Sequence, residues 1–407
     1  MATTLTRRAA LSSALGALAG FALHGGATAQ SARMPFPRWV EAFRTRARAR
    51  GISDAAYNRV MGSLKPDTSV YALDRDQPEF HEEVWQYLNR RVSDWRIKTG
   101  KERAREYAPL LTRIEREYGV DRYTMLGIWG MESAFGDLVT NPKHMRPIFP
   151  ALAALAWGEP RRRSYWEAEL LNALVIVERG WGDPEEMIGS WAGAMGHTQW
   201  MPEVWLNMGV DFNGDGRISP YGPPDDALAG TAKYLSERGK YRAGEGWGYE
   251  ARVPHGIRAS GIRPISAWQA AGVRQASGEP FPRPSERARL WQPVPEGPVF
   301  LLTHNFDAVK SYNPANTYAL AVCHLGDRIA GKGPFAQSFP GAEPLPTLAE
   351  IQEIQQRLTA LGYNSGGTDG RVGKDTMAAI RNFQLKVGMK PDGYAGLKLL
   401  ARLREAA

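Results

Sequence analysis

The sequence contains one cysteine, Cys323, among its 407 residues. A single cysteine excludes an internal disulfide framework and a zinc site built from cysteines. Cys323 stands in the apolar run 318–325. We expect a buried structural thiol there, because reactive thiols need exposure and a positive neighbourhood. No stretch after the N-terminal region reaches the roughly 18 apolar residues of a membrane-spanning helix, so we expect no membrane span.

The N-terminal region has the pattern of an export signal. Arg7 and Arg8 precede a small and apolar run at 9–23, and Ala27-Thr28-Ala29 follows as a small-residue cleavage site. We therefore predict a signal peptide at residues 1–29, which loosely resembles a twin-arginine signal. The alternative is an uncleaved anchor. No cysteine follows the run, which excludes a lipoprotein anchor, and we predict a soluble protein exported to the periplasm.

Composition allows a folded core but does not identify a partner. Apolar residues make up 43% and charged residues 23%, and the length suggests two or three domains. The formal net charge of +8 suits an anionic partner such as nucleic acid, an acidic lipid surface or an acidic polymer, or a basic surface without any partner. Zinc-knuckle cysteines, a recognition-helix signature and RNA-binding aromatic motifs are all missing. We therefore predict no nucleic-acid binding. We also predict that the protein is a monomer.

Local signals predict a mainly helical chain from residue 36 to about 329. Apolar spacing predicts a helix over 102–118, and Pro109 inside it indicates a break or a fresh start. Asp121 is a candidate N-cap of the next helix, and Gly136 is its candidate end. A further helix is expected at 167–177. The Gly- and Pro-rich stretch 244–298 favours strands or irregular structure.

The C-terminal region reads as a separate small domain. Residues 331–346 are rich in Pro and Gly without periodicity, which indicates a linker. Apolar residues then lie on one helical face at 348–361 and again at 376–387, and a third short helix is expected from residue 394 onward. The domain of about 60 residues is near the lower size that folds alone.

The segment 120–136, VDRYTMLGIWGMESAFG, places one acid among apolar residues. On a helix, Glu132 shares its face with Met125, Ile128, Trp129 and Phe135. A carboxylate among apolar side chains loses hydration, which favours its protonated form. Cleavage of a glycosidic bond needs such an acid, because the leaving oxygen must receive a proton. The alternative is a half-exposed or paired glutamate at the edge of the apolar stripe.

A second acid is not evident near Glu132. Ordinary glycoside hydrolysis uses two carboxylates, and Asp137 lies beyond the predicted helix end at Gly136. The pattern fits an enzyme whose substrate supplies the nucleophile.

Four motifs together resemble the membrane-bound lytic transglycosylase B family over roughly residues 36–330. They are GIWGMESAFG (127–136), SWAGAMGHTQWMP (190–202), DFNGDGRISPYGPPDDALAGTAKYL (211–235) and YNPANTYALAV (312–322). Residues 348–403 separately resemble the peptidoglycan-binding domain 1 family, through LGY, DGRVG, AIRNFQ and DG.

The resemblance implies a mainly α (α+β) fold in four parts. These are the signal peptide (1–29), a lysozyme-like catalytic domain with helical additions (30–330), the linker (331–346) and a three-helix peptidoglycan-binding domain (347–407). It further implies cleavage of the β-1,4 bond between N-acetylmuramic acid and N-acetylglucosamine. Glu132 would be the acid that protonates the leaving oxygen and the base that lets the muramyl C6 hydroxyl close a 1,6-anhydro ring. No cofactor is expected for this chemistry.

The resemblance also implies substrate-binding positions: Ser190, Gln199, Tyr234, Tyr312, Asn313, Tyr318 and, as a weaker match, Tyr87. A hydroxyl and an amide beside the acid can hydrogen-bond the N-acetyl group or hold the glutamate, and tyrosine faces suit sugar rings. The alternatives are local turn contacts for Ser190 and Gln199 and plain core packing for the tyrosines. His197 and Trp200 depart from the pattern of relatives and are expected to alter the groove.

The segment DFNGDGR resembles the first half of an EF-hand calcium loop. Oxygen ligands are expected from Asp211, Asn213 and Asp215 and from the carbonyl of Arg217. The usual twelfth-position glutamate is replaced by Gly222, and Asp226, or alternatively Asp225, would close the site. The expected role is a structural Ca²⁺; an Asx-type turn without metal is the alternative.

Two alternatives to a lytic transglycosylase remain open: a lysozyme-type hydrolase that uses the same Glu132, and a non-catalytic peptidoglycan-binding protein. A nucleic-acid binder, suggested by the basic pI, is a third alternative that we do not predict.

Overall fold

The computed structural model describes residues 34–75, 82–142, 145–257 and 260–406. The predicted signal peptide lies outside these residues. The chain forms two units. The first unit contains the described residues of 34–75, 132–234 and 312–314. The second contains those of 82–131, 235–311 and 315–406.

The first unit is helical. Its elements are α1 (Phe36–Ala49), α2 (Asp54–Met61), α3 (Val70–Arg75), α8 (Asp137–Thr140), β1 (Arg146–Pro147), α9 (Ile148–Gly158), η3 (Pro160–Arg162), α10 (Arg163–Glu178), β2 (Ile188–Gly189), α11 (Pro202–Met208) and most of α12 (Asp225–Glu237). Helix α9 is buried along almost its whole length and packs against α10. Because α9 is apolar on all sides, it forms the centre of this unit.

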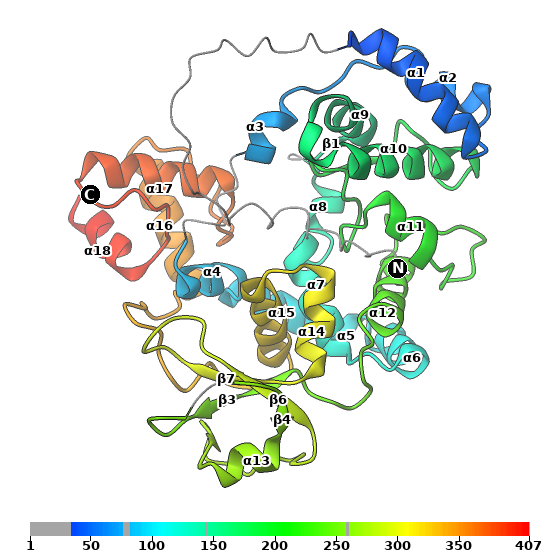
Figure 1. Cartoon of the computed structure of the whole chain (residues 1–407). Helices are drawn as coiled ribbons and strands as arrows, with labels where there is room; N and C mark the ends of the chain where they lie inside the picture. Colours follow the sequence, from blue (N-terminus) through cyan, green and yellow to red (C-terminus); the bar gives the residue numbers. More distant parts are fainter. Residues whose placement is uncertain (1–33, 76–81, 143–144, 258–259, 407) are drawn as a thin grey trace, which may run out of the picture. The chain divides into compact units, whose positions relative to one another are not determined.

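The second unit combines helices with a sheet. Its elements are α4 (Val84–Arg91), α5 (Asp94–Glu106), α6 (Ala108–Tyr118), most of α7 (Arg122–Ser133), β3 (Gly248–Arg252), β4 (Arg263–Pro264), α13 (Ile265–Ala270), β5 (Arg274–Gln275), β6 (Arg287–Trp291), β7 (Val299–Leu302), α14 (His304–Tyr312), α15 (Asn316–Ile329), α16 (Leu348–Ala360), α17 (Lys374–Lys386) and α18 (Leu397–Glu405). The mainly helical fold with a smaller sheet confirms the expected fold class (Figure 1).

Local signals explain several helix boundaries. Helix α5 ends at Glu106, and α6 begins afresh with Pro109 in its first turn, where the missing N–H costs nothing. The carboxylate of Asp121 accepts the N–H of Thr124 over 2.9 Å and caps α7, as predicted. Burial raises the pKa of this carboxyl group above its usual value.

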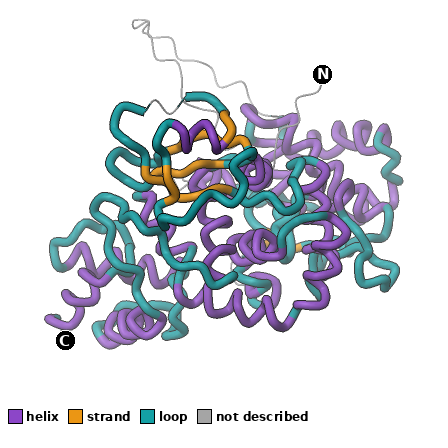
Figure 2. Tube along the Cα trace, turned by 90° about the horizontal axis from the view of Figure 1, so that it is seen from below, coloured by secondary structure: helices purple, strands orange, loops and turns teal. Residues whose placement is uncertain are grey.

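The stretch predicted to contain strands forms an antiparallel sheet, whose strands are among those drawn in orange in Figure 2. Their order in the sheet is β4-β6-β7-β3-β5. Leu301 of β7 pairs with Leu290 of β6, and both pack with Trp268 of α13 on one face. The neighbouring residue Phe300 points to the other face, where its ring is 6.0 Å from that of Trp291. Strands β6 and β7 therefore pack side chains on both faces of the sheet.

The predicted linker has no helix or strand, but it is held against the second unit. The N–H groups of Ala336 and Gln337 each donate to the carboxylate of Glu250 over 2.7 Å. Phe335 stacks on the imidazole of His324 with ring centroids 3.8 Å apart. These contacts make residues 331–346 a packed strap rather than a free tether.

The C-terminal helices form their own core from one face of each helix, including Ile354, Ile380, Phe383, Leu400 and Leu403. Leu358 is fully buried there, as its place on the predicted helical face requires. Cys323 is buried, and burial raises the pKa of its thiol, which fits the predicted structural role. Among the described residues, no helix is long and apolar enough to cross a membrane.

Candidate functional site

Glu132 lies in the last turn of α7, and its side chain is half-buried. Met125, Ile128 and Trp129 of the same helix are buried, as predicted. Helix α7 ends at Ser133 and not at Gly136, so the expected place of Phe135 on the helical face is wrong. Phe135 has a φ of 60°, outside the helical region.

The chain turns sharply after the acid. Ala134 and Phe135 have φ values of 53° and 60°, and Gly136 has 90°. Two consecutive non-glycine residues in the left-handed region are costly, by about 1 kcal/mol or more each. Such strain persists only where surrounding contacts hold it, and it is common at functional sites.

Two contacts fix α7 ahead of the acid. The main-chain oxygen of Gly130 accepts a hydrogen bond from Nε of Arg96 over 3.2 Å, which satisfies a carbonyl in the last turn of the helix. A Cβ atom on Gly127 would lie 2.4 Å from the main-chain oxygen of Val322 in α15. Glycine at 127 therefore allows the two helices to approach closely.

Ser133 links the end of α7 to the loop 190–201. Its buried hydroxyl donates to the main-chain oxygen of His197 over 2.5 Å and accepts the N–H of Gly136 over 2.9 Å. The next residue in the loop, Thr198, receives further support. Its main-chain oxygen accepts the hydroxyl of Tyr312 over 2.6 Å, and its side chain accepts that of Thr231 over 2.9 Å.

The loop carries two of the predicted binding residues. Ser190 is half-buried, and its hydroxyl accepts the N–H groups of Ala192 and Ala194, which is the local turn contact left open above. Gln199 is buried with a φ of 54°, and its side-chain amide donates to the main-chain oxygen of Gly196 over 3.0 Å. The loop geometry thus depends on both residues.

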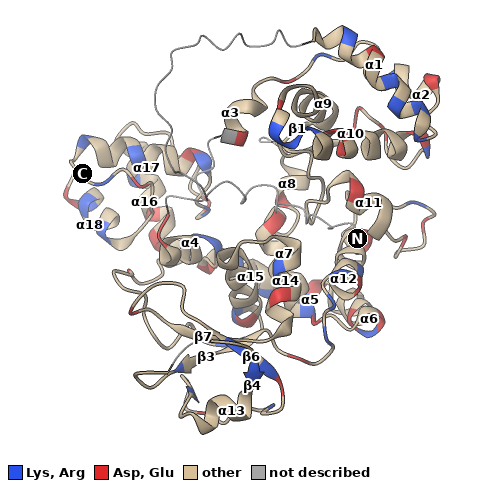
Figure 3. Ribbon diagram, in the orientation of Figure 1, with Lys and Arg blue, Asp and Glu red and all other residues tan. Residues whose placement is uncertain are grey.

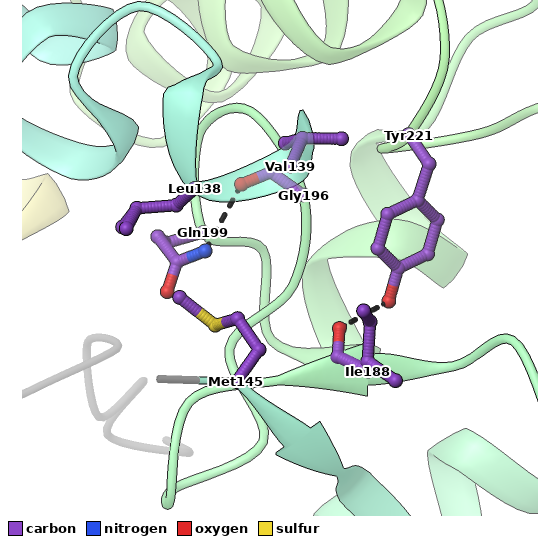
Figure 4. A pocket seen from close by; sticks show the side chains of 7 residues that line it. All are labelled: Leu138, Val139, Met145, Ile188, Gly196, Gln199 and Tyr221. Carbon is purple, nitrogen blue, oxygen red and sulfur yellow. Dashed lines mark hydrogen bonds between the residues drawn. The ribbon is translucent and has the colours of Figure 1, made fainter. Parts of the chain in front are cut away.

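Gln199 lines a small cavity with Leu138, Val139, Met145, Ile188, Gly196 and Tyr221 (Figure 4). Its volume is about 10 Å³, which is near the least that one water molecule needs. The hydroxyl of Tyr221 donates to the main-chain oxygen of Ile188 over 2.6 Å. Leu138 and Val139 belong to α8, which directly follows the turn after Glu132. The cavity is therefore lined in part by residues that are close to the acid in sequence.

The predicted tyrosines are all buried. Tyr234 and Tyr312 are each 1% exposed and pack edge to face with centroids 5.2 Å apart. Asn313 is 5% exposed and belongs to the same unit as Glu132, Ser190 and Gln199. Tyr87 and Tyr318 are buried in the second unit.

His197 and Trp200 are also buried. The His197 ring hydrogen-bonds the main-chain oxygen of Gly222 over 2.7 Å. It thereby connects the loop 190–201 to residues 211–226, which we call the Asp loop. A Cβ on Gly230 would lie 2.5 Å from the Trp200 ring. These departures from the family pattern therefore act inside the core of the first unit.

The Asp loop is ordered by its own carboxylates. Asp211 accepts the N–H groups of Gly214 and Gly216 over 2.8 and 2.9 Å. Asp226, in the first turn of α12, accepts those of Phe212 and Ser219 over 2.8 and 3.0 Å. Burial raises the pKa of Asp226.

The chemistry of the predicted donor set, with oxygen atoms from Asp211, Asn213, Asp215, Arg217 and Asp226, suits Ca²⁺. Within the described ranges, however, no three His, Cys, Asp or Glu side chains lie close enough to hold a metal ion. The main-chain bonds to Asp211 and Asp226 use part of their acceptor capacity and hold the loop in an Asx-type form.

The basic residues of α1 and α2, visible in Figure 3, are largely paired. Arg48 contacts Asp54 over 2.7 Å, and Arg59 contacts Asp183 over 2.7 Å. This part of the chain therefore offers fewer unpaired charges than its composition suggests.

Sequence reasoning missed Ser133, Arg96 and Thr231 as supports of the site. Ser133 stands next to the predicted acid inside the quoted motif, which is a usable signal. Arg96 and Thr231 reach their partners from distant parts of the chain, and no local pattern marks them.

Helix α7 carries a half-buried acid in its last turn, and Ser133 joins its end to a glycine-rich loop. These features fit a transglycosylase of the lysozyme-like class. Residues 35–327 match the transglycosylase SLT domain family, and residues 347–403 match a peptidoglycan binding domain family. The chain belongs to the transglycosylase SLT domain family.

Known proteins agree with this assignment. The chain is 29% identical to the membrane-bound lytic murein transglycosylase B of Escherichia coli K12 over 278 residues, 67% of this chain and 73% of that protein. It is similar to SltB3 of Pseudomonas aeruginosa, solved in complex with NAG-anhNAM-pentapeptide, with a TM-score of 0.71 and 39% identity over 91% of this chain and all of that one. It also resembles the Escherichia coli lytic transglycosylase Slt35 in complex with calcium, with a TM-score of 0.62 and 27% identity over 73% and 93% of the chains.

Proposed function

We propose that this transglycosylase cleaves the β-1,4 bond between N-acetylmuramic acid and N-acetylglucosamine in peptidoglycan and leaves 1,6-anhydromuramyl ends. The observation that carries the proposal is the half-buried Glu132 at the strained end of α7. The similar SltB3 was solved with a ligand that contains the anhydro sugar, which supports the same product here.

In the proposed mechanism Glu132 acts first as acid and then as base. Its protonated carboxyl group gives a proton to the glycosidic oxygen as the bond to the muramyl C1 breaks. The resulting carboxylate then takes the proton of the muramyl C6 hydroxyl, and that oxygen bonds to C1. No water is consumed, so a second carboxylate that holds water is unnecessary.

The remaining predicted residues have supporting roles in this proposal. Ser190 and Gln199 shape the loop beside the acid and offer hydrogen bonds to an N-acetyl group. The buried tyrosines Tyr234 and Tyr312 hold that loop through Thr198. We propose that Asn313, which lies in the same unit as Glu132, contributes to the glycan site. Tyr318 and Tyr87, in the second unit, stay predicted substrate-binding residues.

The decisive test is the mass of the products from purified sacculi. The proposal expects muramyl ends with the anhydro mass, and no products from the Glu132→Gln variant. Ends heavier by one water would instead show a lysozyme-type hydrolase with the same acid. Unchanged cleavage by Glu132→Gln would remove Glu132 from the mechanism, and no cleavage by either protein would favour a non-catalytic wall-binding protein.

We further propose that the C-terminal domain, residues 347–407, binds the cell wall and raises the local concentration of substrate. Its deletion should weaken sedimentation with peptidoglycan more than cleavage of short soluble fragments. Equal losses would contradict this role. Action on peptidoglycan requires a place outside the cytoplasm, which supports the predicted export to the periplasm.

A further inference from the structure

An arginine cluster surrounds two aromatic rings where α4 and α5 meet the C-terminal domain. It consists of Arg90, Arg91, Arg96 and Arg371. The guanidinium carbons of Arg91 and Arg90 lie 5.6 and 5.9 Å from the centre of the Tyr87 ring. That of Arg371, from the DGRVG loop, lies 4.7 Å from the centre of the Trp95 ring.

Polar contacts hold the C-terminal domain at this place. The amide of Gln86 donates to Asp392 over 3.0 Å, and that of Asn89 donates to the hydroxyl of Tyr394 over 2.9 Å. The N–H of Leu348 donates to the carboxylate of Asp94 over 3.1 Å. The cluster therefore combines residues of the transglycosylase domain with one residue of the C-terminal domain.

The cluster carries more positive than negative charge. Arg90 is paired with Glu82, and Nε of Arg371 lies 3.9 Å from the carboxylate of Asp369. Arg96 donates to main-chain oxygens, at Gly130 over 3.2 Å and at Arg90 over 3.0 Å.

The positive charge of Arg91 has the fewest polar contacts in the cluster. Its Nε is buried without a hydrogen-bond partner, and its guanidinium group lies over the Tyr87 ring. In the described part of the chain no carboxylate pairs with Arg91 or Arg96. Two positive charges at this place thus have no anionic partner among the residues that the structure describes.

Such an arrangement is costly unless an anion completes it. Burial, followed by the nearby positive charges of Arg91, Arg90 and Arg371, lowers the pKa of Arg96 to about 9. Like charges in a poorly hydrated place repel one another, and a buried donor without a hydrogen-bond partner destabilises the fold. A carboxylate relieves both costs, because the planar guanidinium group binds it through two parallel hydrogen bonds.

We propose that the arginine cluster binds a carboxylate of the peptidoglycan stem peptide, with Arg91 and Arg371 as its main ligands. The identity of the ligand rests on the proposed function, since stem peptides are the carboxylate-bearing part of that substrate. The flat faces of Tyr87 and Trp95 keep the guanidinium groups in place. Because Arg371 comes from the C-terminal domain, that domain would recognise the peptide jointly with α4.

The test measures binding without turnover, in the full chain with Glu132→Gln. Calorimetry compares a disaccharide-tetrapeptide muropeptide with the same compound whose carboxylates are amidated. We expect the carboxylate form to bind about tenfold more tightly. Arg91→Gln and Arg371→Gln should each bring this affinity ratio close to one. Arg402→Gln removes an arginine of the same domain outside the cluster, paired with Glu405, and should keep the ratio.

If the two compounds bind with equal affinity when the cluster is unsubstituted, the proposal is overturned. It is also overturned if Arg91→Gln and Arg371→Gln leave the affinity ratio unchanged, or if Arg402→Gln brings the ratio to one as well. A single-stranded oligonucleotide that binds more tightly than the muropeptide would overturn it in favour of a phosphate ligand. If Arg91→Gln does not fold, Arg91→Lys keeps the charge without the planar fork and should still lower the ratio. Products with hydrolytic ends would contradict the proposed function alone, because the ratio does not depend on cleavage.

Discussion

The hydroxyl of Ser133 bridges the turn after Glu132 and the loop that carries Gln199. It donates to the main-chain oxygen of His197 over 2.5 Å and accepts the N–H of Gly136 over 2.9 Å. Both partners lie in the first unit, and Ser133 itself is fully buried. One side chain therefore sets the position of the proposed acid relative to the loop beside it.

Ser133→Ala should lower both stability and turnover. The substitution removes one hydrogen-bond partner from a buried carbonyl and one from a buried N–H, which costs about 1–3 kcal/mol of unfolding free energy. A small displacement of Glu132 should lower kcat by about tenfold or more, while KM changes little. Steady-state kinetics on soluble glycan fragments and urea unfolding check both effects.

Ser365→Ala is a matched control. Ser365 is buried in the C-terminal domain and donates to the main-chain oxygens of Gly367 and Gln355. Its removal should lower stability to a similar degree without the loss of kcat. Equal losses of kcat in the two variants would show that Ser133 acts through general stability.

The parts of the fold that could be predicted are those with local causes. Pro109 is tolerated in the first turn of a helix but not in its middle, and Asp121 can cap a helix. The boundaries of α6 and α7 therefore follow from neighbouring residues. The same holds for the helices of the C-terminal domain, whose apolar spacing already defines their buried faces. Glu132 could be predicted as a candidate acid because it stands alone in an apolar helix and inside a family motif.

The supports of the site could not be predicted, because their causes are distant in sequence. Arg96 reaches Gly130, and Tyr312 reaches Thr198, across long stretches of chain. The early end of α7 also escaped prediction. The apolar pattern continues to Phe135, but the contacts of Ser133 fix a left-handed turn there.

Gly127→Ala should disturb the helix that carries the acid. The new Cβ would lie 2.4 Å from the main-chain oxygen of Val322, and a main-chain atom cannot turn away as a side chain can. Overpacking of this kind costs about 1–3 kcal/mol, and the shift of α7 should lower kcat as well. Gly246→Ala, whose Cβ would meet no heavy atom within 4 Å, should change neither. Unchanged thermal unfolding of Gly127→Ala would contradict the close packing of α7 on α15.

Calcium should stabilise the first unit through the Asp loop. If Ca²⁺ binds the oxygen donors of Asp211 and Asp226, its addition in excess over EGTA raises Tm by mass action. Asp211→Ala should abolish this increment. Because burial raises the pKa of Asp226, protons compete with the metal, and the increment should fade as the pH falls.

Asp183→Ala separates the metal effect from the loss of a turn. Asp183 also accepts a main-chain N–H, from Glu185 over 3.0 Å, and is paired with Arg59. This variant should lower Tm equally with calcium and with EGTA. A calcium increment that survives in Asp211→Ala would exclude the Asp loop as the binding site.

His324 should make the second unit sensitive to acid. Its imidazole is buried against Phe335, and burial, with a smaller contribution from Arg328, lowers its pKa from 6.5 to about 3. Between these values the unfolded chain binds a proton that the folded chain does not. The free energy of unfolding therefore falls as the pH decreases from 6.5 towards 3, by at most about 1.4 kcal/mol per pH unit from this residue.

His324→Phe should remove this contribution, because phenylalanine keeps the stacked ring and does not titrate. Urea unfolding is measured at pH 7, 6, 5 and 4, with hydrogen exchange of α15 as the readout. The free energy of unfolding should decrease less steeply with falling pH in the variant than in the unsubstituted protein. Carboxylates titrate in both proteins, so their effect cancels in the difference. His255→Gln alters an exposed histidine and should keep the original slope. Parallel stability curves for His324→Phe and the unsubstituted protein would show that proton uptake at His324 does not oppose folding.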